Sequence, residues 1–242
     1  MELLGDVIAW LSDPANWTGD RGLLMRLWEH TSISVLGTVI AAALALPPAL
    51  LLGHLRRGGF LAVTFVNLGR AVPSFGVVGV MFPITLAIPL LVSPLGFWAT
   101  LIALVLLAMP PMFVNTYTGV SEVDPALVES AKGMGMTGSQ VLRSVELPLA
   151  MPLVMAGVRT GAVAVVATAT LGAVVGFGGL GRYIIDGFAQ GNDVLIIVGG
   201  LFVAIGSILT ELGLGWLERR SDPLRRSQRS EGHVNVVEQA PA

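Results

Sequence analysis

The chain has 242 residues, of which 54% are hydrophobic and only 12% carry a charge. Soluble domains average about 45–50% apolar and about 25% charged residues, so this chain has too little charge to cover a surface that faces water. The composition argues against a soluble enzyme, a nucleic-acid-binding protein and a disordered chain. The absence of cysteine excludes a disulfide framework, a thiolate metal site and a Cys nucleophile.

The first segment, residues 1–27, is expected outside the membrane or along its surface. It begins with acidic rather than basic residues, so it does not resemble a cleavable signal peptide. Trp10 and Trp17 lie within this segment, and Trp28 follows directly. Tryptophan is enriched at the boundary between lipid and water, which agrees with a position at the interface.

Five long apolar runs follow, and runs of about 18 or more apolar residues are typical of membrane-spanning helices. The predicted spans are Ile33–Leu52, Phe60–Val92, Leu95–Asn115, Pro152–Val175 and Val194–Leu217. The second run would be about 50 Å long as one helix, against about 30 Å of hydrocarbon. Pro73, Pro83 and Pro89 interrupt it. We interpret it as one tilted, broken span with an irregular portion inside the protein; two short spans are the alternative.

The distribution of basic residues predicts the orientation, because Lys and Arg concentrate in cytoplasmic loops. With five spans, nine of the 14 basic residues fall on one side of the membrane: Arg56, Arg57, Lys132, Arg143, Arg219, Arg220, Arg225, Arg226 and Arg229. Arg21, Arg26 and Arg182 fall on the other side. The prediction is therefore an all-α membrane protein with its N-terminus outside, its C-terminus in the cytoplasm and a disordered cytoplasmic tail at 218–242. Six spans would place Arg56 and Arg57 outside.

The cytoplasmic connection Thr116–Met151 is predicted to form a helix–turn–helix. Asp124 and Pro125 are typical of a helix start, since Asp caps the first turn and Pro fits the first helical position. An apolar stripe is expected at Leu127, Ala131 and Met134, and a stop at Gly133 or Gly135.

The second helix of this connection is predicted to start at Thr137–Gln140, which matches a capping box, and to end at Pro148. The pair of helices has two interpretations. It is either an amphipathic hairpin lying on the head groups, or a docking element that enters a groove of another protein.

A known signature runs through this connection. Glu129-Ser130-Ala131, then Gly135, Val145 and Leu147-Pro148, resembles the E-A-A-x3-G-x9-I-x-L-P signature of the membrane subunits of bacterial ATP-binding-cassette importers. The spacing matches throughout, and Ser130 for Ala and Val145 for Ile are conservative departures.

Three further stretches resemble the same family: Asn67–Ser74 with N-x-x-R-x-x-P-S, Gly157–Gly161 with G-I-R-T-A, and Gly176–Gly181 with G-x-G-G-L-G. The similarity is greatest to permeases for glycine betaine, carnitine and choline, with D-methionine permeases close behind. It implies a type I importer core of five spans at 28–217, with coupling helices at about 124–147. It also implies a bacterial plasma-membrane location.

The resemblance also implies the partners. These are a dimer of ATPase subunits, a second copy of the permease or a related permease, and an extracytoplasmic solute-binding protein. ATP and Mg²⁺ would be bound by the ATPase, so this chain is expected to bind no cofactor and to catalyse no reaction. The residues implied in coupling are Asp124, Glu129, Ser130, Ala131, Gly135, Leu147 and Pro148. Glu129 would pair with a basic or hydrogen-bonding group on the ATPase, and Ala131 and Gly135 would keep the contact close.

Charged and polar residues inside the spans are candidates for the solute pathway or for helix pairing. Arg159 and Glu211 lie at similar depths, so they predict either an interhelical ion pair or a side chain that reaches to the cytoplasm. Arg70 is expected to face a polar pathway or the partner subunit. The other candidates are Asn67, Pro73, Ser74, Asn115 and Thr116. Phe97, Trp98, Phe113 and Tyr117 could contact a quaternary ammonium, but aromatic residues at span ends are more often interface anchors.

Several other interpretations are weaker. Gly176–Gly181 also matches a dinucleotide-binding motif, but it follows a predicted span instead of a strand, so a tight outer turn is expected, with Tyr183 at the interface. His30, His54 and His233 lie in polar flanks and are expected to be solvated. No metal-site or catalytic constellation is evident. An ion-coupled secondary transporter remains the alternative of a different class, although such transporters normally have more spans and internal repeats.

Overall fold

The computed structural model describes residues 2–60, 64, 73–92 and 94–221, and every regular element in this part of the chain is helical. The α-helices are α1 (Glu2–Ser12), α2 (Leu23–His54), α4 (Ser74–Leu86), α5 (Phe97–Ser121), α6 (Pro125–Gly133), α7 (Gly138–Val141), α8 (Leu147–Thr168), α9 (Gly181–Gln190) and α10 (Asp193–Ser221). Short 3₁₀ segments are η1 (Pro14–Asn16), η2 (Pro89–Leu91) and η4 (Ala169–Val175), and a π-helical turn, η3, covers Leu142–Glu146.

Four helical stretches are long and apolar enough to cross a membrane: Leu23–His54, Phe97–Ser121, Gly138–Val175 and Asp193–Arg220. They correspond to the first, third, fourth and fifth predicted spans, and each extends beyond the apolar run at one end or both, although the third helix starts two residues later than predicted. The reason is visible at the start of α2, where Arg26 pairs with Glu29 at 2.8 Å. At this end of α2 the helix therefore continues past the hydrophobic run with its charged residues paired.

The second predicted span is described only over its C-terminal half. There α4 is a 13-residue helix that begins after Pro73 and retains Pro83 inside it. The chain then bends at Ala87 and Ile88, and Pro89 starts η2. A break in the helix is therefore present between Leu86 and Pro89. Its residues are exposed in this chain, Ile88 by 43% and Leu90 by 85%, so the predicted position inside the protein is not seen here. The prediction of one broken span extends to residues outside the described ones.

Small residues allow the central helices α2, α5 and α8 to pack closely. Ala41, Ala45 and Ala49 recur every four residues on α2, and none of them is exposed. On α8, a Cβ added at Gly157 would lie 2.8 Å from the Pro111 carbonyl oxygen of α5. Close backbone approach of this kind is the usual packing mode of helices in lipid, where no hydrophobic effect pulls helices together.

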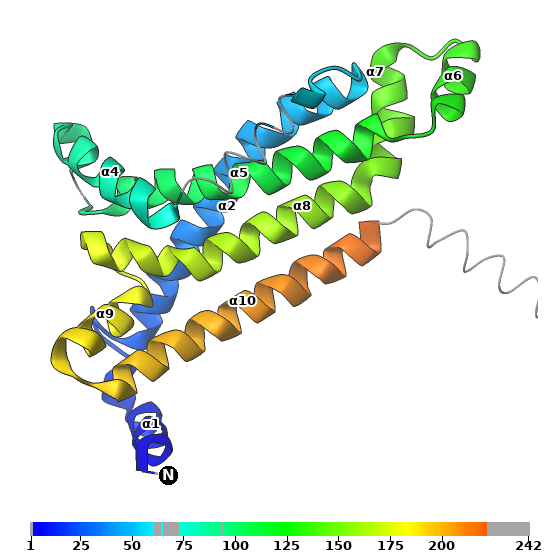
Figure 1. The fold of residues 1–242 in the computed structure, drawn as a ribbon. Helices are drawn as coiled ribbons and strands as arrows, with labels where there is room; N and C mark the ends of the chain where they lie inside the picture. The colour runs from blue at the N-terminus through cyan, green and yellow to red at the C-terminus, as the bar shows by residue number, and fades with distance from the viewer. Residues whose placement is uncertain (1, 61–63, 65–72, 93, 222–242) are drawn as a thin grey trace, which may run out of the picture.

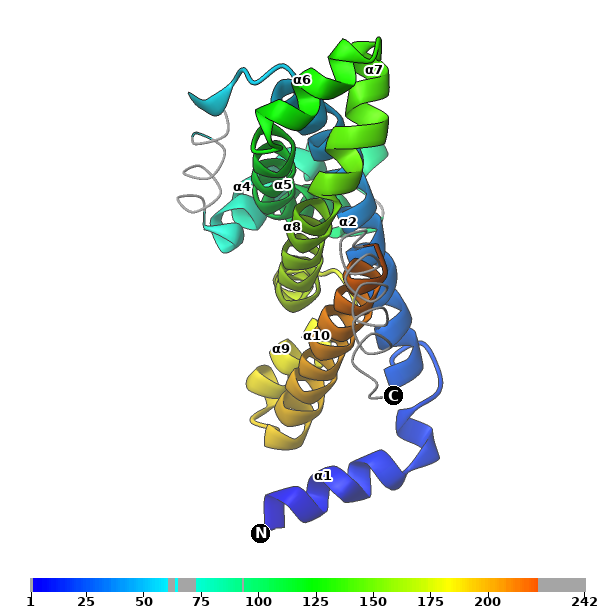
Figure 2. The ribbon, with the colours of Figure 1, turned by 90° about the vertical axis from the view of Figure 1, so that its right-hand side faces the viewer.

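The helices lie roughly along one direction and give the molecule two distinct ends (Figure 1). The α6–α7 hairpin stands at one end, beside the C-terminal ends of α2 and α5. At the other end lie α9, η4 and the C-terminal part of α4 (Figure 1), and Figure 2 shows α1 beyond α9, on the side away from the hairpin. The first helix lies beyond α9, whereas the last turn of α10 points toward the hairpin side of the molecule (Figure 1); which side of the membrane each faces stays a prediction.

The N-terminal segment closes over the end that carries α9. Trp17 donates its indole N–H to the Leu11 carbonyl at 2.7 Å and meets Phe202 of α10 edge to face. Tyr183 of α9 lies beneath Trp10, is 8% exposed, and donates its hydroxyl to the Arg21 carbonyl at 2.9 Å. Tyr183 was expected at the membrane interface; the structure buries it against α1, and its depth in the membrane stays a prediction. Burial raises the pKa of the Tyr183 phenol, and the nearby charge of Arg26 partly opposes this shift.

Candidate functional site

The α6–α7 hairpin has a small apolar core of its own. Val123, Val128, Ala131 and Val141 are all buried, and Met136, Val145 and Leu149 pack around them. The predicted helix–turn–helix is therefore a folded unit that projects from the long helices (Figure 1).

The inward face of α6 differs from the predicted stripe. Val128 and Ala131 point into the hairpin, at 6% and 2% exposed, whereas Leu127 is 48% and Met134 78% exposed. The predicted stripe of Leu127, Ala131 and Met134 is therefore not one buried face, because only Ala131 is buried. Its small side chain serves the internal packing of the hairpin, so it is not available to keep a partner close. The exposed residues of α6 include Leu127, Glu129, Ser130 and Lys132, and the exposed Met134 follows directly after the helix.

Both ends of α6 are fixed by local chemistry. The Asp124 carboxylate accepts the Ala126 N–H at 2.8 Å, and Pro125 occupies the first turn, as predicted. At the other end Gly135 has φ +85°, the Met136 N–H reaches the Ala131 carbonyl, and the Gly135 N–H reaches the Lys132 carbonyl. This is a Schellman termination, whose left-handed position favours glycine. The exposed surface of α6 is thus held in a preformed helix.

The backbone at Gly135 leads to a testable expectation. A Cβ added at Gly135 would meet nothing within 4 Å, so strain comes only from the left-handed φ. Gly135→Ala should destabilise the end of α6 by about 1 kcal/mol, and Gly135→Asn by less, because Asn tolerates this conformation better. Hydrogen exchange of the hairpin amides in purified protein measures the difference. Equal protection in both variants and in the wild type would contradict it.

The second helix of the hairpin starts as predicted but does not end as predicted. Gln140 accepts the Thr137 N–H at 2.7 Å and completes the capping box. The helix then continues without a break into α8, so the predicted end at Pro148 is wrong. The π-helical turn η3 explains this, because the Leu147 N–H bonds to the Leu142 carbonyl, five residues back. Pro148, which lacks an N–H, follows directly after this turn, and the helix continues past it. Leu147 and Pro148 are both half-buried.

Arg159 and Glu211 are brought together across α8 and α10. Arg159 Nη1 lies 3.1 Å from Glu211 and its Nε lies 3.3 Å from Glu218, about two turns further along α10. A Cβ added at Gly215 would lie 3.2 Å from Arg159 Nη1, so this glycine leaves room for the guanidinium. The structure thus favours interhelical pairing for these residues, one of the two predicted arrangements.

The other pathway candidates are dispersed. Asn115 donates to the Pro111 carbonyl of its own helix at 2.7 Å, and Thr116 is fully buried. Pro73 precedes α4 and is exposed, and Ser74 is its first residue. Asn67 and Arg70 lie outside the described residues. A pathway lined by these residues together stays a prediction.

The aromatic candidates do not form one cage. Phe97 and Trp98 meet edge to face at the start of α5, with ring centroids 5.3 Å apart. Phe113 is 2% exposed in the core, and Tyr117 lies five turns from Phe97 along the same helix, about 30 Å away. Aromatic side chains that are separated in this way cannot surround one quaternary ammonium.

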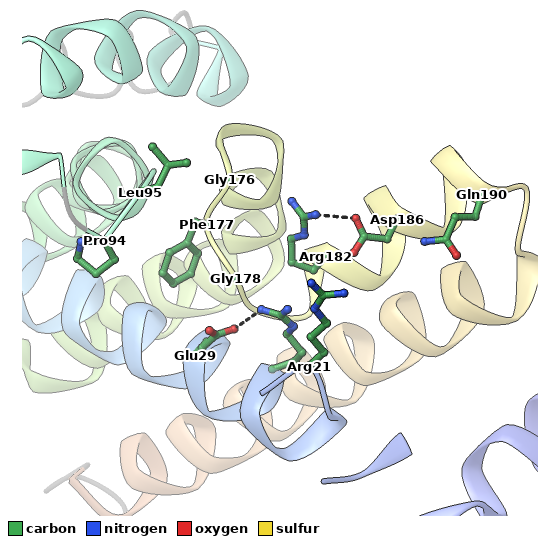
Figure 3. Close-up of a pocket in the computed structure, with 11 residues that line it drawn as sticks. Arg21, Glu29, Pro94, Leu95, Gly176, Phe177, Gly178, Arg182, Asp186 and Gln190 are labelled. Atoms are coloured by element: carbon green, nitrogen blue, oxygen red, sulfur yellow. Dashed lines mark hydrogen bonds and ion pairs between the residues drawn. The ribbon is translucent and has the colours of Figure 1, made fainter. Parts of the chain in front are cut away.

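A polar pocket opens at the end of the molecule opposite the hairpin, with a volume of about 690 Å³. Figure 3 shows Arg21, Glu29, Arg182 and Asp186 around it, from α9 and from the beginning of α2 and the residues before it. Arg182 pairs with Asp186 at 2.7 Å. Within the described part of the chain, the guanidinium of Arg21 has no ion pair. The pocket therefore offers a positive group to a partner or solute.

The glycine run Gly176–Gly181 forms one wall of this pocket. Gly176 and Gly179 have φ of +85° and +76°, and the Gly179 N–H donates to Glu29 at 2.7 Å. A 3₁₀ helix precedes the run where a dinucleotide site would need a strand, so the predicted tight turn is confirmed. The helix after it, α9, was not predicted, although Arg182 and Asp186 at i, i+4 and a left-handed Gly191 are its sequence signals.

Comparison with known proteins agrees with this geometry. Residues 24–223 match the family model described as the binding-protein-dependent transport system inner membrane component. The chain belongs to this family of membrane permeases. It is therefore a multi-pass protein of the plasma membrane and a permease subunit of an ATP-binding-cassette importer, as the signature at Glu129–Pro148 indicated.

Curated relatives cover nearly the whole permease. The carnitine transport permease protein OpuCD of Listeria monocytogenes is 34% identical over 88% of this chain and 92% of its own length. The glycine betaine/carnitine/choline transport system permease protein OpuCD of Bacillus subtilis is 36% identical over 85% of this chain and 87% of its own.

Solved structures support the fold. The MetNI methionine ABC transporter in an inward-facing form has a chain with a TM-score of 0.71 and 22% identity, covering 82% of this permease and 95% of that chain. An amino acid ABC transporter crystallised with histidines gives a TM-score of 0.65 at 18% identity, over 81% and 92%. These chains share the all-helical fold of type I importer permeases.

Proposed function

We propose that this permease imports an osmoprotectant such as glycine betaine, carnitine or choline. The support is the set of curated relatives at 34–36% identity, whose names give these solutes. The structural neighbours that transport methionine or bind histidine are below 25% identity and bear on the fold alone.

The observation that carries the mechanism is the preformed, outward-facing surface of α6. A helix capped at both ends, with Leu127, Glu129 and the following Met134 exposed, has the form of a helix that docks in a groove. We assign this groove to a separate ATPase, one subunit beneath each of two permeases. Closure of the ATPases on ATP would move the hairpins and switch the permeases between inward- and outward-facing states, since ATP binds one state better. Glu129 and Ser130 would make the polar contacts.

The same proposal fixes the orientation and the outer partner. The hairpin lies in the cytoplasm and the pocket of Arg21 and Arg182 faces outward, which corresponds to five spans with the N-terminus outside. We assign the surface around this pocket to the solute-binding protein, whose acidic residues would meet the unpaired Arg21. The solute path lies between two permeases, and this chain binds no ATP itself.

Uptake into vesicles tests this function. Permease, ATPase and binding protein from one genome would be reconstituted, and radiolabelled betaine, carnitine, choline and methionine supplied with or without internal ATP. The expected result is ATP-dependent uptake of a quaternary ammonium solute that an ionophore does not abolish. Uptake of methionine only would replace the solute class. Uptake by the permease alone that an ionophore abolishes would indicate a secondary transporter.

A further inference from the structure

One titratable pair in the molecule has no part in the arrangement described so far. Glu146 is 1% exposed at the junction of the hairpin and α8, and its carboxylate accepts a hydrogen bond from Nδ1 of His54 at 2.5 Å. His54 is the last residue of α2 and its side chain is 18% exposed. The expectation that this histidine is solvated is wrong, as it is for His30, which donates to the Val166 carbonyl at 2.9 Å; His233 lies outside the described residues. Burying an ionised carboxylate costs much free energy unless the group is paired or hydrogen-bonded, so buried Glu146 depends on its contact with His54.

The chain places Glu146 there by a local departure from α-helical geometry. Glu146 is the last residue of the π-helical turn η3. One additional residue in a helical turn rotates the residues beyond it by about 100° relative to an uninterrupted α-helix. Such turns are rare and are frequently found at functional sites. Here the turn directs the one acidic residue of the junction inward, against the end of α2.

The end of α2 contacts the hairpin region at two further points. Arg56 donates to the Val123 carbonyl at 2.7 Å, just where the chain leaves α5 for α6. Arg56 does so with φ +50°, a conformation that non-glycine residues rarely adopt. A Cβ added at Gly138, the first residue of α7, would lie 3.3 Å from Nε2 of His54. The end of α2 therefore touches the hairpin at its entry, at its turn into α7 and at its exit.

We propose that His54 and Glu146 are positioning residues that join the hairpin to the first membrane-spanning helix, so that a displacement of α6 by the ATPase is passed to α2 as well as to α8. Covalent continuity alone would pass the movement to α5 and α8, which flank the hairpin in the chain. The residues after α2 already contact the entry of the hairpin through Arg56, and the hydrogen bond at Glu146 adds a link from α2 to its exit. This inference rests on the proposed docking of α6 to an ATPase.

Four variants of the complete importer in vesicles test it: His54→Gln, Glu146→Gln, the double variant, and Glu122→Gln as a matched control. Glu122 is exposed at the end of α5, so the same chemical change there breaks no contact in the described structure. The measured quantity is solute transported per ATP hydrolysed. Both single variants should bind the ATPase and hydrolyse ATP, while transport per ATP falls about fivefold or more. The double variant should recover a large part of the loss, because two amide side chains can hydrogen-bond to each other.

The outcomes separate the possibilities. Unchanged transport per ATP in Glu146→Gln would overturn the role of the pair. A loss of ATPase binding and of thermal stability in both single variants, with no recovery in the double variant, would also overturn it, since the pair would then only hold the fold together. If the wild-type chain neither binds an ATPase nor takes up solute with ATP, the proposed function itself fails, whatever the variants do.

Discussion

Leu127→Glu should separate the permease from its ATPase while leaving the permease folded. Leu127 is 48% exposed on the outward surface of α6 and lies in the first turn of that helix. An acidic residue in a first turn stabilises a helix, so the hairpin itself should not suffer. Burying a leucine in a partner contributes about 1.5–3 kcal/mol, so its loss should weaken ATPase binding by about 10–100-fold. The ATPase that co-purifies with tagged permease measures the effect.

The matched control is Leu4→Glu. Leu4 is 67% exposed on α1, at the opposite end of the molecule from the hairpin (Figure 1), and the chemical change is the same. This variant should retain the ATPase in wild-type amount. If Leu127→Glu also retains it, the outward surface of α6 is not the docking surface.

The ends of α6 could be predicted from the sequence, but its faces could not. Asp124 and Gly135 act through hydrogen bonds to residues a few positions away, so the local sequence is sufficient to predict their roles. Which side of α6 faces inward depends on where the chain returns after the turn. The residues that pack against α6 include Val141. The periodicity of the α6 sequence cannot predict where Val141 lies relative to α6.

Partners far away in the sequence explain the other differences. Arg159 and Glu211 could be paired from their depths in two spans, because both helices cross the same membrane. No such rule relates His54 to Glu146, which are 92 positions apart. The π-helical turn that brings Glu146 inward is also the reason why the helix does not end at Pro148 as predicted. The hydropathy of the sequence does not reveal such a turn. The polar residues that flank His54 in the sequence suggested a solvent-exposed side chain, whereas in the folded structure this side chain has a hydrogen-bond partner.

Gly178→Ala should have the largest effect at the outer end. A Cβ at Gly178 would lie 2.0 Å from Oε2 of Glu29, an impossible distance. That carboxylate accepts the Gly179 N–H at 2.7 Å and pairs with Arg26 at 2.8 Å, so it cannot move without breaking both contacts. Overpacking of a close site costs about 1–3 kcal/mol, and the loss of two charge-assisted hydrogen bonds adds to this. The midpoint of thermal unfolding in detergent should fall by several degrees, and ATP-dependent uptake should fall with it.

A second substitution distinguishes the steric cause from a general effect of alanine. Glu29→Ala removes the atoms that the new Cβ would meet, so Gly178→Ala in a Glu29→Ala background should cost much less than in the wild type, a coupling between neighbours that a double-mutant cycle measures. Gly200→Ala is the control for alanine itself, since a Cβ at Gly200 on α10 meets nothing within 4 Å. It should leave the unfolding midpoint unchanged. Equal losses from Gly178→Ala in both backgrounds would show that Glu29 is not what requires a glycine there.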